Sequence, residues 1–254
     1  MVKAVISGCF GKMGKVVGDV ISKRDDIEAV AGVDKITAGE LSFETVTDIS
    51  DLTCKPDVII DFSHPSALPG LLNYAKTNGT ALVLATTGYS ETDIAEIKSA
   101  SAQVPIFFTA NMSIGINLLS ALAKKAATIL GDDYDIEIVE KHHNQKIDAP
   151  SGTALMLADS INEVRDERYN YIYDRHSQRK KRDKTEIGIH SVRGGTIVGE
   201  HEIIFAGRDE VITLSHSAAS KEVFAVGAVN AAVFLSGKPA GMYSMQDLIE
   251  ASGN

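Results

Sequence analysis

The chain has 254 residues, enough for one large domain or two smaller ones, and its 44% hydrophobic and 23% charged residues are typical of a globular protein. A formal net charge of −9 argues against nucleic acid or an anionic membrane surface as a partner. We find no signal peptide, no segment of transmembrane length and no disulfide framework in the two cysteines, Cys9 and Cys54, so we expect a cytoplasmic protein.

Strands and helices alternate over the first half of the chain. Residues 3–7 are a short apolar run that ends at Gly8, and residues 12–22 place their apolar side chains on one helical face. By the same criteria we expect strands over 27–33, 58–62, 81–85 and 105–108, and helices over 65–78, 91–102 and 116–130. This alternation predicts an α/β fold with a parallel, doubly wound sheet.

The pattern changes after Tyr134. Residues 135–140 alternate like a half-exposed strand, and residues 151–164 have a helical pattern. Strand-like runs over 185–192, 196–205 and 210–217 then follow one another without helices between them, before a long apolar helix over 222–235. Such runs predict a mixed or antiparallel sheet, and therefore a second domain.

Glycines form a G-x-x-G-x-x-G pattern, Gly8, Gly11 and Gly14, between the first strand and the first helix. Glycine allows a sharp turn and lets the backbone approach a pyrophosphate at the helix start. Asp34 closes the second strand, where a ribose-binding carboxylate belongs. A plain strand-to-helix turn is the alternative. The spacing does not match a nucleoside-triphosphate loop, and no Tyr-x-x-x-Lys pair of short-chain dehydrogenases occurs.

Two further short segments follow predicted strands. Ala85-Thr86-Thr87-Gly88 comes after one strand, and Ala110-Asn111-Met112-Ser113 comes after the next. Ligands of open α/β sheets bind at the carboxyl ends of the strands, and small residues there let the backbone approach a nicotinamide ring. Ordinary strand-to-helix turns explain these segments equally well.

The segment E-K-H-H-N-Q-K-I-D-A-P-S-G-T-A, residues 140–154, combines proton donors with a helix start. His142, His143 and Lys146 supply positive charge, and Ser151-Gly152-Thr153 begins a helix whose free amides favour an anion. A capped helix after a polar turn would explain the second half of the segment but not the first. A zinc site is disfavoured because adjacent histidines seldom point the same way and no third ligand accompanies them, so we expect no metal.

These motifs, together with R-G-G-T-I-V-G-E-H at residues 193–201, resemble the 4-hydroxy-tetrahydrodipicolinate reductase family, long called dihydrodipicolinate reductase. The resemblance spans Val2 to Leu248. It implies a Rossmann-type cofactor domain, residues 1–113 and 219–254, and a smaller α+β mixed-sheet domain for substrate binding and tetramerisation, residues 114–218. It also implies a homotetramer that reduces 4-hydroxy-tetrahydrodipicolinate to tetrahydrodipicolinate with NADH or NADPH, in the diaminopimelate route to lysine.

The resemblance also assigns roles to individual positions. It implies that His142 is a proton donor or acceptor, that Lys146 is the proton donor, and that the cyclic dicarboxylate is bound by His143, Gly152 and Thr153, to which the helix start adds Ser151. The cofactor positions are Gly8, Cys9, Phe10, Gly11, Lys12, Met13, Asp34 with the adjacent Lys35, Ala85, Thr86, Thr87, Ala110, Asn111 and Met112.

Three positions depart from the family pattern. Cys9-Phe10 replaces a smaller pair, which predicts a bulkier glycine loop, and Met112 stands where phenylalanine is frequent. Lys221 stands where arginine is usual, so a bidentate contact there would be lost. Two rival functions remain at this stage: another nicotinamide-dependent reductase of the same build, and a nucleotide sensor without catalysis. The proton donors beside the helix start argue against the sensor.

Overall fold

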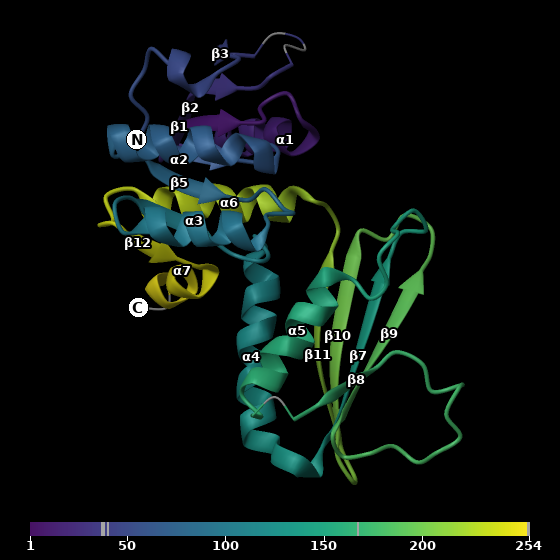
Figure 1. Cartoon of the computed structure of the whole chain (residues 1–254). Coiled ribbons are helices and arrows are strands. Elements are labelled where there is room, and N and C mark those ends of the chain that lie inside the picture. The colour runs from purple at the N-terminus through teal and green to yellow at the C-terminus, as the bar shows by residue number, and fades with distance from the viewer. Residues whose placement is uncertain (37–38, 40, 167, 253–254) are drawn as a thin grey trace. The chain divides into compact units, whose positions relative to one another are not determined.

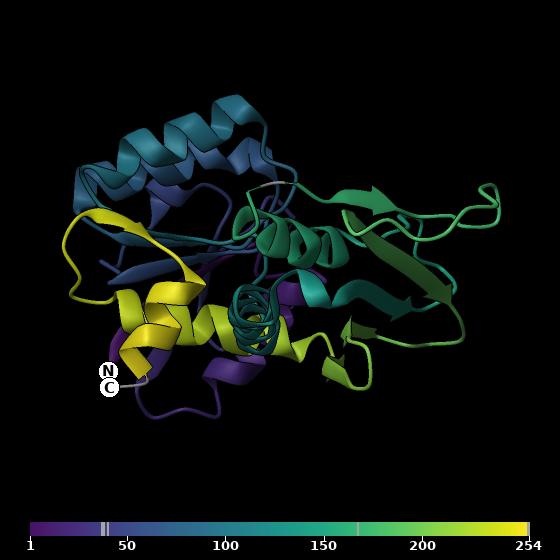
Figure 2. The ribbon, with the colours of Figure 1, turned by 90° about the horizontal axis from the view of Figure 1, so that it is seen from below.

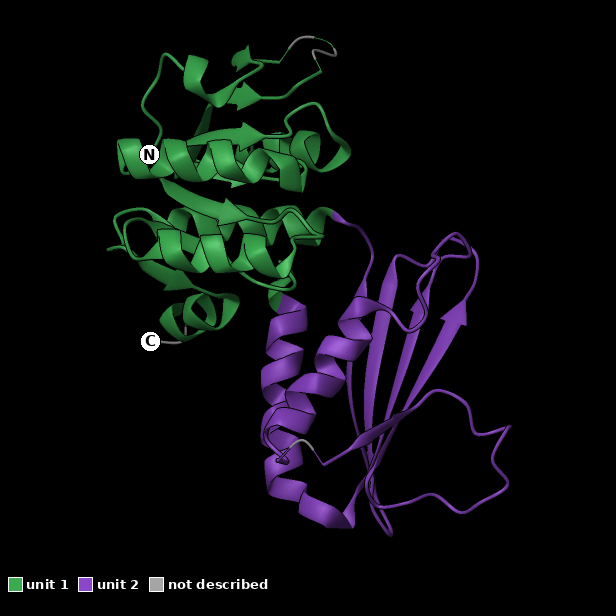
Figure 3. Ribbon diagram, viewed as in Figure 1, with its two compact units in different colours: residues 1–114, 222–254 green, residues 115–221 purple. Residues whose placement is uncertain are grey.

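The protein folds into two compact units in the computed structural model, which describes residues 1–36, 39, 41–166 and 168–252 (Figures 1 and 3). Unit 1 comprises residues 1–114 and 222–254, and unit 2 comprises residues 115–221. The chain therefore leaves unit 1 once and returns to it for its last segment.

Unit 1 is built on a parallel sheet that contains seven strands within the described residues. The strands are β1 (Val2–Ser7), β2 (Ile27–Val33), β3 (Glu44–Val46), β4 (Val58–Asp61), β5 (Ala81–Leu84), β6 (Pro105–Phe108) and β12 (Gly241–Tyr243). Their order is β12-β6-β5-β4-β1-β2-β3, so the strand order reverses between β1 and β4. Ligands of doubly wound sheets bind at that reversal, outside the carboxyl ends of the strands.

Helices cover both faces of this sheet (Figure 2). The helices of unit 1 are α1 (Lys12–Ile21), α2 (Leu68–Asn78), α3 (Glu91–Ser101), α6 (Glu222–Leu235) and α7 (Met245–Ser252). One core joins α1, α6 and α7 to side chains such as Ile6 and Phe107, and a second joins α2 and α3 to their strand neighbours, such as Val5 and Ile106. Strands buried on both faces explain the continuous apolar runs in the sequence.

Unit 2 combines a mixed sheet with two long helices. Its strands are β7 (Asp135–His142), β8 (Asn170–Ile172), β9 (Glu186–Arg193), β10 (Gly199–Ala206) and β11 (Val211–Ala218), in the order β11-β10-β7-β9-β8. β10 is antiparallel to both β7 and β11, whereas β9 is parallel to both β7 and β8. Helices α4 (Ile114–Leu130) and α5 (Gly152–Glu163) pack on one face of this sheet.

The fold class expected from the sequence, a parallel α/β sheet plus a mixed-sheet segment, is confirmed. Most element boundaries agree within a few residues, but the helix expected to begin at Pro65 opens as a 3₁₀ turn, Pro65–Ala67, before α2. The sequence patterns missed β3, β8, β12 and α7. The three strands have three residues each, too few to show a period.

The expectation that no segment has transmembrane length was wrong. The helical segment Ile114–Asp133 has 20 residues and a mean hydropathy of 1.2, which is enough by length and composition to cross a membrane. Core helices of globular domains pass the same test, and Ile116, Leu119, Ala123 and Ala127 of this segment pack in the core of unit 2.

Candidate functional site

The glycine loop between β1 and α1 has the close backbone approach that a pyrophosphate requires. Gly8 has φ +78°, a left-handed conformation that favours glycine, and its carbonyl accepts a 3.0 Å hydrogen bond from the Gly11 amide. A Cβ on Gly14 would lie 2.1 Å from the Gly8 oxygen, so the third glycine lets α1 pack against the loop. No described side chain caps the start of α1 at Gly11, which leaves its first amides available to an anion.

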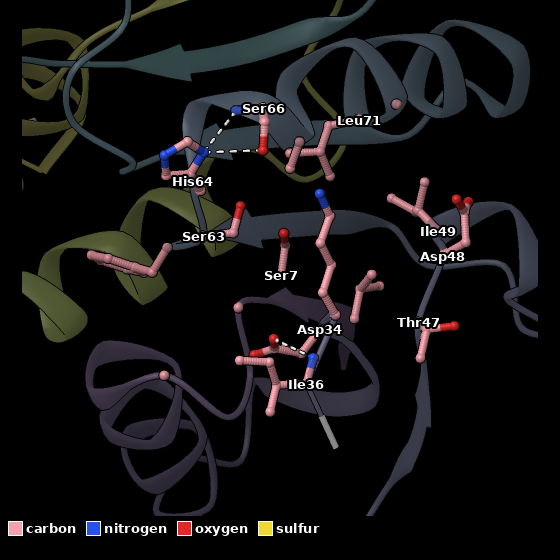
Figure 4. Close-up of a pocket in the computed structure, with 17 residues that line it drawn as sticks. Ser7, Asp34, Ile36, Thr47, Asp48, Ile49, Ser63, His64, Ser66 and Leu71 are labelled. Carbon is pink, nitrogen blue, oxygen red and sulfur yellow. Dashed lines mark hydrogen bonds between the residues drawn. The ribbon is translucent and has the colours of Figure 1, made fainter. Parts of the chain in front are cut away.

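Asp34 holds this loop in place. One of its carboxylate oxygens accepts the Phe10 amide at 3.0 Å and the other accepts the Ile36 amide at 3.2 Å, the latter drawn in Figure 4. Each oxygen keeps a lone pair for another donor, such as a ribose hydroxyl. Gly8, Gly11, Asp34 and Lys35 line a pocket of about 570 Å³.

The far wall of this pocket comes from segments that the sequence did not single out. His64 Nδ1 lies 3.2 Å from the Ser66 amide and 3.0 Å from its hydroxyl, which fixes the turn after β4 (Figure 4). The other lining residues of this wall are Thr47, Asp48, Ile49, Ala67, Gly70 and Leu71. Within this mixed wall, Ile49, Ala67 and Leu71 offer apolar surface for the adenosine part of a dinucleotide.

A second pocket, of about 410 Å³, lies at the ends of β4, β5 and β6. It is lined by seven of the expected cofactor residues, Met13, Ala85, Thr86, Thr87, Ala110, Asn111 and Met112, and also by Phe62, Ser63, Thr109 and Phe224. Phe62 and Ser63 line both pockets, so the two pockets are adjacent. The residues present therefore fit a nicotinamide dinucleotide.

Three of the expected cofactor residues, Cys9, Phe10 and Lys12, line neither pocket. The Cys9 side chain is buried against Gly32, and burial, followed by the charge of Asp34, raises the pKa of its thiol to about 11. Phe10 packs on the core and contributes its amide to Asp34. The Cys9 and Phe10 side chains therefore pack in the core and do not fill either pocket.

In unit 2, His142 lies at the end of β7 beside a buried carboxylate. Its Nδ1 lies 2.6 Å from Oε2 of Glu140, a side chain with no exposed surface. A Cβ on Gly199 would lie 3.1 Å from His142 Nε2, so the glycine leaves room for that atom. Because a carboxylate accepts hydrogen bonds, Glu140 selects the tautomer with a proton on Nδ1 and leaves Nε2 for exchange.

Arg193 keeps Glu140 ionised. Its guanidinium donates to both carboxylate oxygens, at 2.8 and 2.7 Å, in a bidentate pair. Burial by itself would raise the pKa of Glu140, but hydrogen bonds from Arg193, Ser191 and His142 outweigh burial and lower that pKa to about 2. The histidine therefore faces a fixed negative charge at every physiological pH.

The start of α5 is tied to the same carboxylate. Ser151 caps the helix, its hydroxyl accepting the Ala154 amide at 3.2 Å, and its own amide donates to Glu140 Oε1 at 3.2 Å. The same hydroxyl lies 3.2 Å from His201 Nε2, and the rings of His142 and His201 meet edge to face with centroids 5.3 Å apart. Burial, together with the nearby charge of His142, lowers the pKa of His201 to about 4, so His201 is neutral at pH 7.

Lys146 and the α5 start already hold a carboxylate in this structure. Lys146 Nζ lies 2.9 Å from Asp148 Oδ1, and the Gly152 amide also favours the ionised form of Asp148. These interactions, first that of Lys146, lower the pKa of Asp148. The Lys146 ammonium and the Gly152 amide therefore converge on one carboxylate position. His143 is half-buried, and its carbonyl accepts the Lys146 amide at 3.1 Å.

Sequence reasoning missed Glu140, Arg193 and His201. The alternation of β7 carried a signal for Glu140, because Ile136 and Ile138 face the core and a period of two puts Glu140 and His142 on that same face. Arg193 lies 53 residues away, so only the pairing of β9 with β7 reveals it. Within the described residues, no group of three or more histidine, cysteine or acidic side chains could hold a metal ion.

Comparison with known proteins matches both parts of the chain to one family. The model of the dihydrodipicolinate reductase N-terminus matches residues 2–112, and that of the C-terminus matches residues 115–249. The 4-hydroxy-tetrahydrodipicolinate reductases of Caldanaerobacter subterraneus subsp. tengcongensis and Clostridium tetani are 52% and 49% identical to this chain. These matches cover 98% and 99% of this chain, and 99% and 98% of the relatives.

Solved structures agree with the family models. A dipicolinate-bound dihydrodipicolinate reductase from Paenisporosarcina sp. TG-14 superimposes with a TM-score of 0.81 at 26% identity, covering 96% of this chain and 97% of that chain. A probable dehydrogenase from Thermotoga maritima, with a TM-score of 0.63 at 12% identity, shares the fold over 98% of this chain and 93% of that chain. The chain belongs to the dihydrodipicolinate reductase family of nicotinamide-dependent oxidoreductases.

Proposed function

We propose that the protein reduces 4-hydroxy-tetrahydrodipicolinate to tetrahydrodipicolinate in the diaminopimelate route to lysine. The observation that carries the proposal is the convergence of the Lys146 ammonium and the Gly152 amide on one carboxylate position, beside a histidine fixed by a buried glutamate. The names of the full-length relatives, and the dipicolinate bound to the similar solved structure, support the substrate class, a cyclic dicarboxylate.

The overall reaction requires one hydride and one proton. Replacing the 4-hydroxyl group by hydrogen consumes both and releases one water. The nicotinamide ring supplies the hydride when the cofactor is bound in the groove of unit 1. Loss of water leaves a C=C bond conjugated with the ring C=N, and hydride addition at C4 moves the electron pair to the ring nitrogen. The chain's own residues must then bind two carboxylates and deliver a proton to that nitrogen, and the enamine so formed tautomerises to the cyclic imine of the product.

Lys146 and the α5 start bind the first carboxylate. A substrate carboxylate exchanges with the Asp148 side chain, takes over the Lys146 ammonium and the Gly152 amide, and gains Thr153 as a further donor of the helix start. The exchange is nearly balanced in charge, because one carboxylate replaces another. His143, next to this cluster, adds polar surface for the second carboxylate.

Lys146 is the proton donor to the ring nitrogen, and His142 is the second proton-transfer group. The Lys146 side chain is 23% exposed, against 11% for His142, so the ammonium is the more accessible of the two. Glu140 holds His142 with Nε2 free, and the imidazole can restore the lysine proton through solvent or substrate. Positioned acid catalysis of this kind contributes ~10²–10⁴ in rate.

Unit 1 is proposed as the dinucleotide-binding domain, and unit 2 as the substrate-binding and tetramerisation domain. Both cysteines are free thiols, which supports a reducing compartment such as the cytoplasm. We expect NADH to be used well and NADPH to be tolerated. Asp34 repels a 2′-phosphate, whereas Lys35, which lines the same pocket, attracts it through a mobile and strongly hydrated charge.

The proposal is tested by following loss of reduced nicotinamide absorbance with freshly generated 4-hydroxy-tetrahydrodipicolinate and with simple keto acids. Turnover of the ring dicarboxylate alone is expected. Lys146→Ala and His142→Ala should lower kcat strongly with little change in cofactor affinity, and Thr153→Val should act mainly on the substrate KM. Near-normal turnover in both of the first two variants would overturn the mechanism.

The same assay run with NADH and NADPH tests the cofactor preference. A preference for NADPH above about tenfold in kcat/KM, ~1.4 kcal/mol, would show that Lys35 outweighs Asp34. In that case Lys35→Ala should erase the preference.

A further inference from the structure

Asp61 is a buried carboxylate to which the proposed mechanism assigns no role. It ends β4 and has no exposed surface. One oxygen accepts the Ser63 hydroxyl at 2.5 Å and the Ser63 amide at 3.3 Å. The other accepts the Thr86 hydroxyl at 2.7 Å and the Tyr89 hydroxyl at 3.2 Å. Four donors and no acceptor are the partners that an ionised carboxylate requires.

These hydrogen bonds join the loops that form the nicotinamide-side pocket. Ser63 and Thr86 both line that pocket and both donate to Asp61. Tyr89 extends the connection to the end of β6, because its ring meets Phe108 edge to face with centroids 6.1 Å apart. The Asp61 carboxylate thus stands one side chain behind the pocket wall and holds the loops that follow two adjacent strands, β4 and β5.

Within the described residues, no lysine, arginine or histidine forms an ion pair with Asp61. Neutral donors satisfy its hydrogen bonds but leave its charge uncompensated, which is costly in a buried position. A positive charge that forms in the adjacent pocket would compensate it. The reduced nicotinamide ring is neutral, and the oxidised ring carries a positive charge.

We propose that Asp61 is a positioning residue of the nicotinamide site: it fixes Ser63 and Thr86 in the pocket wall, and its charge favours the oxidised ring over the reduced ring. When hydride leaves with its electron pair, positive charge develops on the ring, and the carboxylate stabilises that charge without moving. The inference rests on the cofactor part of the proposed function and is independent of the substrate.

The experiment compares the binding of NAD⁺ and NADH to the full chain without substrate. NADH is titrated by its fluorescence, and NAD⁺ by displacement of NADH. In Asp61→Asn, the ratio of the NAD⁺ to the NADH dissociation constant should rise about tenfold, as expected for loss of one buried charge near the ring. Tyr89→Phe and Thr86→Val keep the charge while loosening the loops, so both dissociation constants should rise by the same factor.

An Asp61→Asn protein that loses affinity for both forms equally would overturn the electrostatic role, as would an equal shift of the ratio in Tyr89→Phe. If Asp61→Asn does not fold, the double variant Asp61→Asn/Tyr89→Phe removes the donor that would oppose the new amide, and the same ratio is expected of it. A parent chain that binds neither NADH nor NAD⁺ would instead refute the cofactor part of the proposed function.

Discussion

The orientation of His142 depends on the charge of Glu140, which is not one of the residues proposed to bind substrate. A buried carboxylate held by a bidentate arginine cannot relax when its partner histidine gains or loses a proton, so the imidazole is kept in one tautomer. The same carboxylate accepts the Ser151 amide, which couples the proton-transfer group to the helix start that binds a carboxylate.

Glu140→Gln tests this coupling. The amide keeps the shape but leaves the Arg193 charge uncompensated and no longer selects one tautomer of His142. We expect kcat to fall at least about tenfold, since positioned proton-transfer groups contribute ~10²–10⁴. The NADH dissociation constant should not change, because its residues belong to unit 1. Glu163→Gln removes an exposed carboxylate of α5 and is the control; unchanged pH–rate profiles in Glu140→Gln would contradict the coupling.

His201 makes the stability of the fold depend on pH. Its pKa is about 4 in the folded protein and 6.5 in an unfolded chain, so between these values the unfolded state binds more protons. The stabilisation is complete above about pH 6.5 and is lost as pH falls towards 4, by up to ~3 kcal/mol. His216, paired with it across β10 and β11, also has a lowered pKa because of burial and acts in the same direction.

Urea unfolding at pH 7, 6 and 5 measures this dependence. His201→Gln should flatten the fall in unfolding free energy between pH 6.5 and 5, whereas His176→Gln, at an exposed histidine, should leave it unchanged. Glu140 does not contribute to the slope over this range. Its pKa is about 2 in the folded protein, so the stabilisation that it provides is lost only below about pH 4.5. A slope that is identical in the parent chain and in His201→Gln would refute the assignment.

At the scale of elements, α6 fixes the position of the segment that carries Met112. A Cβ on Gly227 would lie 1.7 Å from the Met112 carbonyl oxygen, so only glycine lets the helix touch that backbone. Gly227→Ala should therefore push Met112 out of the pocket wall and weaken NADH binding, and it should destabilise unit 1 by ~1–3 kcal/mol through overpacking.

The control for Gly227→Ala is Gly18→Ala in α1. Its Cβ would meet only Ile6 Cδ1, at 3.8 Å, an ordinary contact. The gain in helix propensity should then stabilise the protein by ~0.5–1 kcal/mol and leave NADH binding unchanged. Thermal unfolding and NADH titration of both variants measure the two effects. Unchanged NADH affinity in Gly227→Ala would show that α6 does not set the position of Met112.

The two halves of the candidate site were predictable to different degrees. The glycine loop, Asp34 and the strand-end segments were accessible because each is a local pattern next to a strong apolar run. Asp61 also ends such a run, but its role depends on Thr86 and Tyr89, which β5 brings beside it. Arg193 and His201 reach Glu140 and Ser151 only through sheet pairing, so local patterns could not assign them.

At the scale of the whole molecule, no helix in the described part of unit 2 covers the second face of its mixed sheet. Ile136, Ile138, Ile203 and Phe205 face α4 and α5, and the alternate residues form the open face. That face carries paired charges, such as Lys141 with Glu200 and Glu202, around the apolar side chains of Val139 and Ile204. Such a surface can join copies of the chain, in agreement with the proposed homotetramer.

Ile204→Glu tests whether this face assembles the protein. The new carboxylate would lie on the open face, so association would have to bury an added charge and would lose apolar contact. Light scattering should give about four times the chain mass of 27.1 kDa for the parent protein and a smaller mass for the variant, with an unchanged circular dichroism spectrum. Ile129→Glu, on α4 where Ile129 is 70% exposed, is the matched control. If Ile129→Glu dissociates the assembly and Ile204→Glu does not, the exposed face of α4 joins the copies and the open sheet face does not.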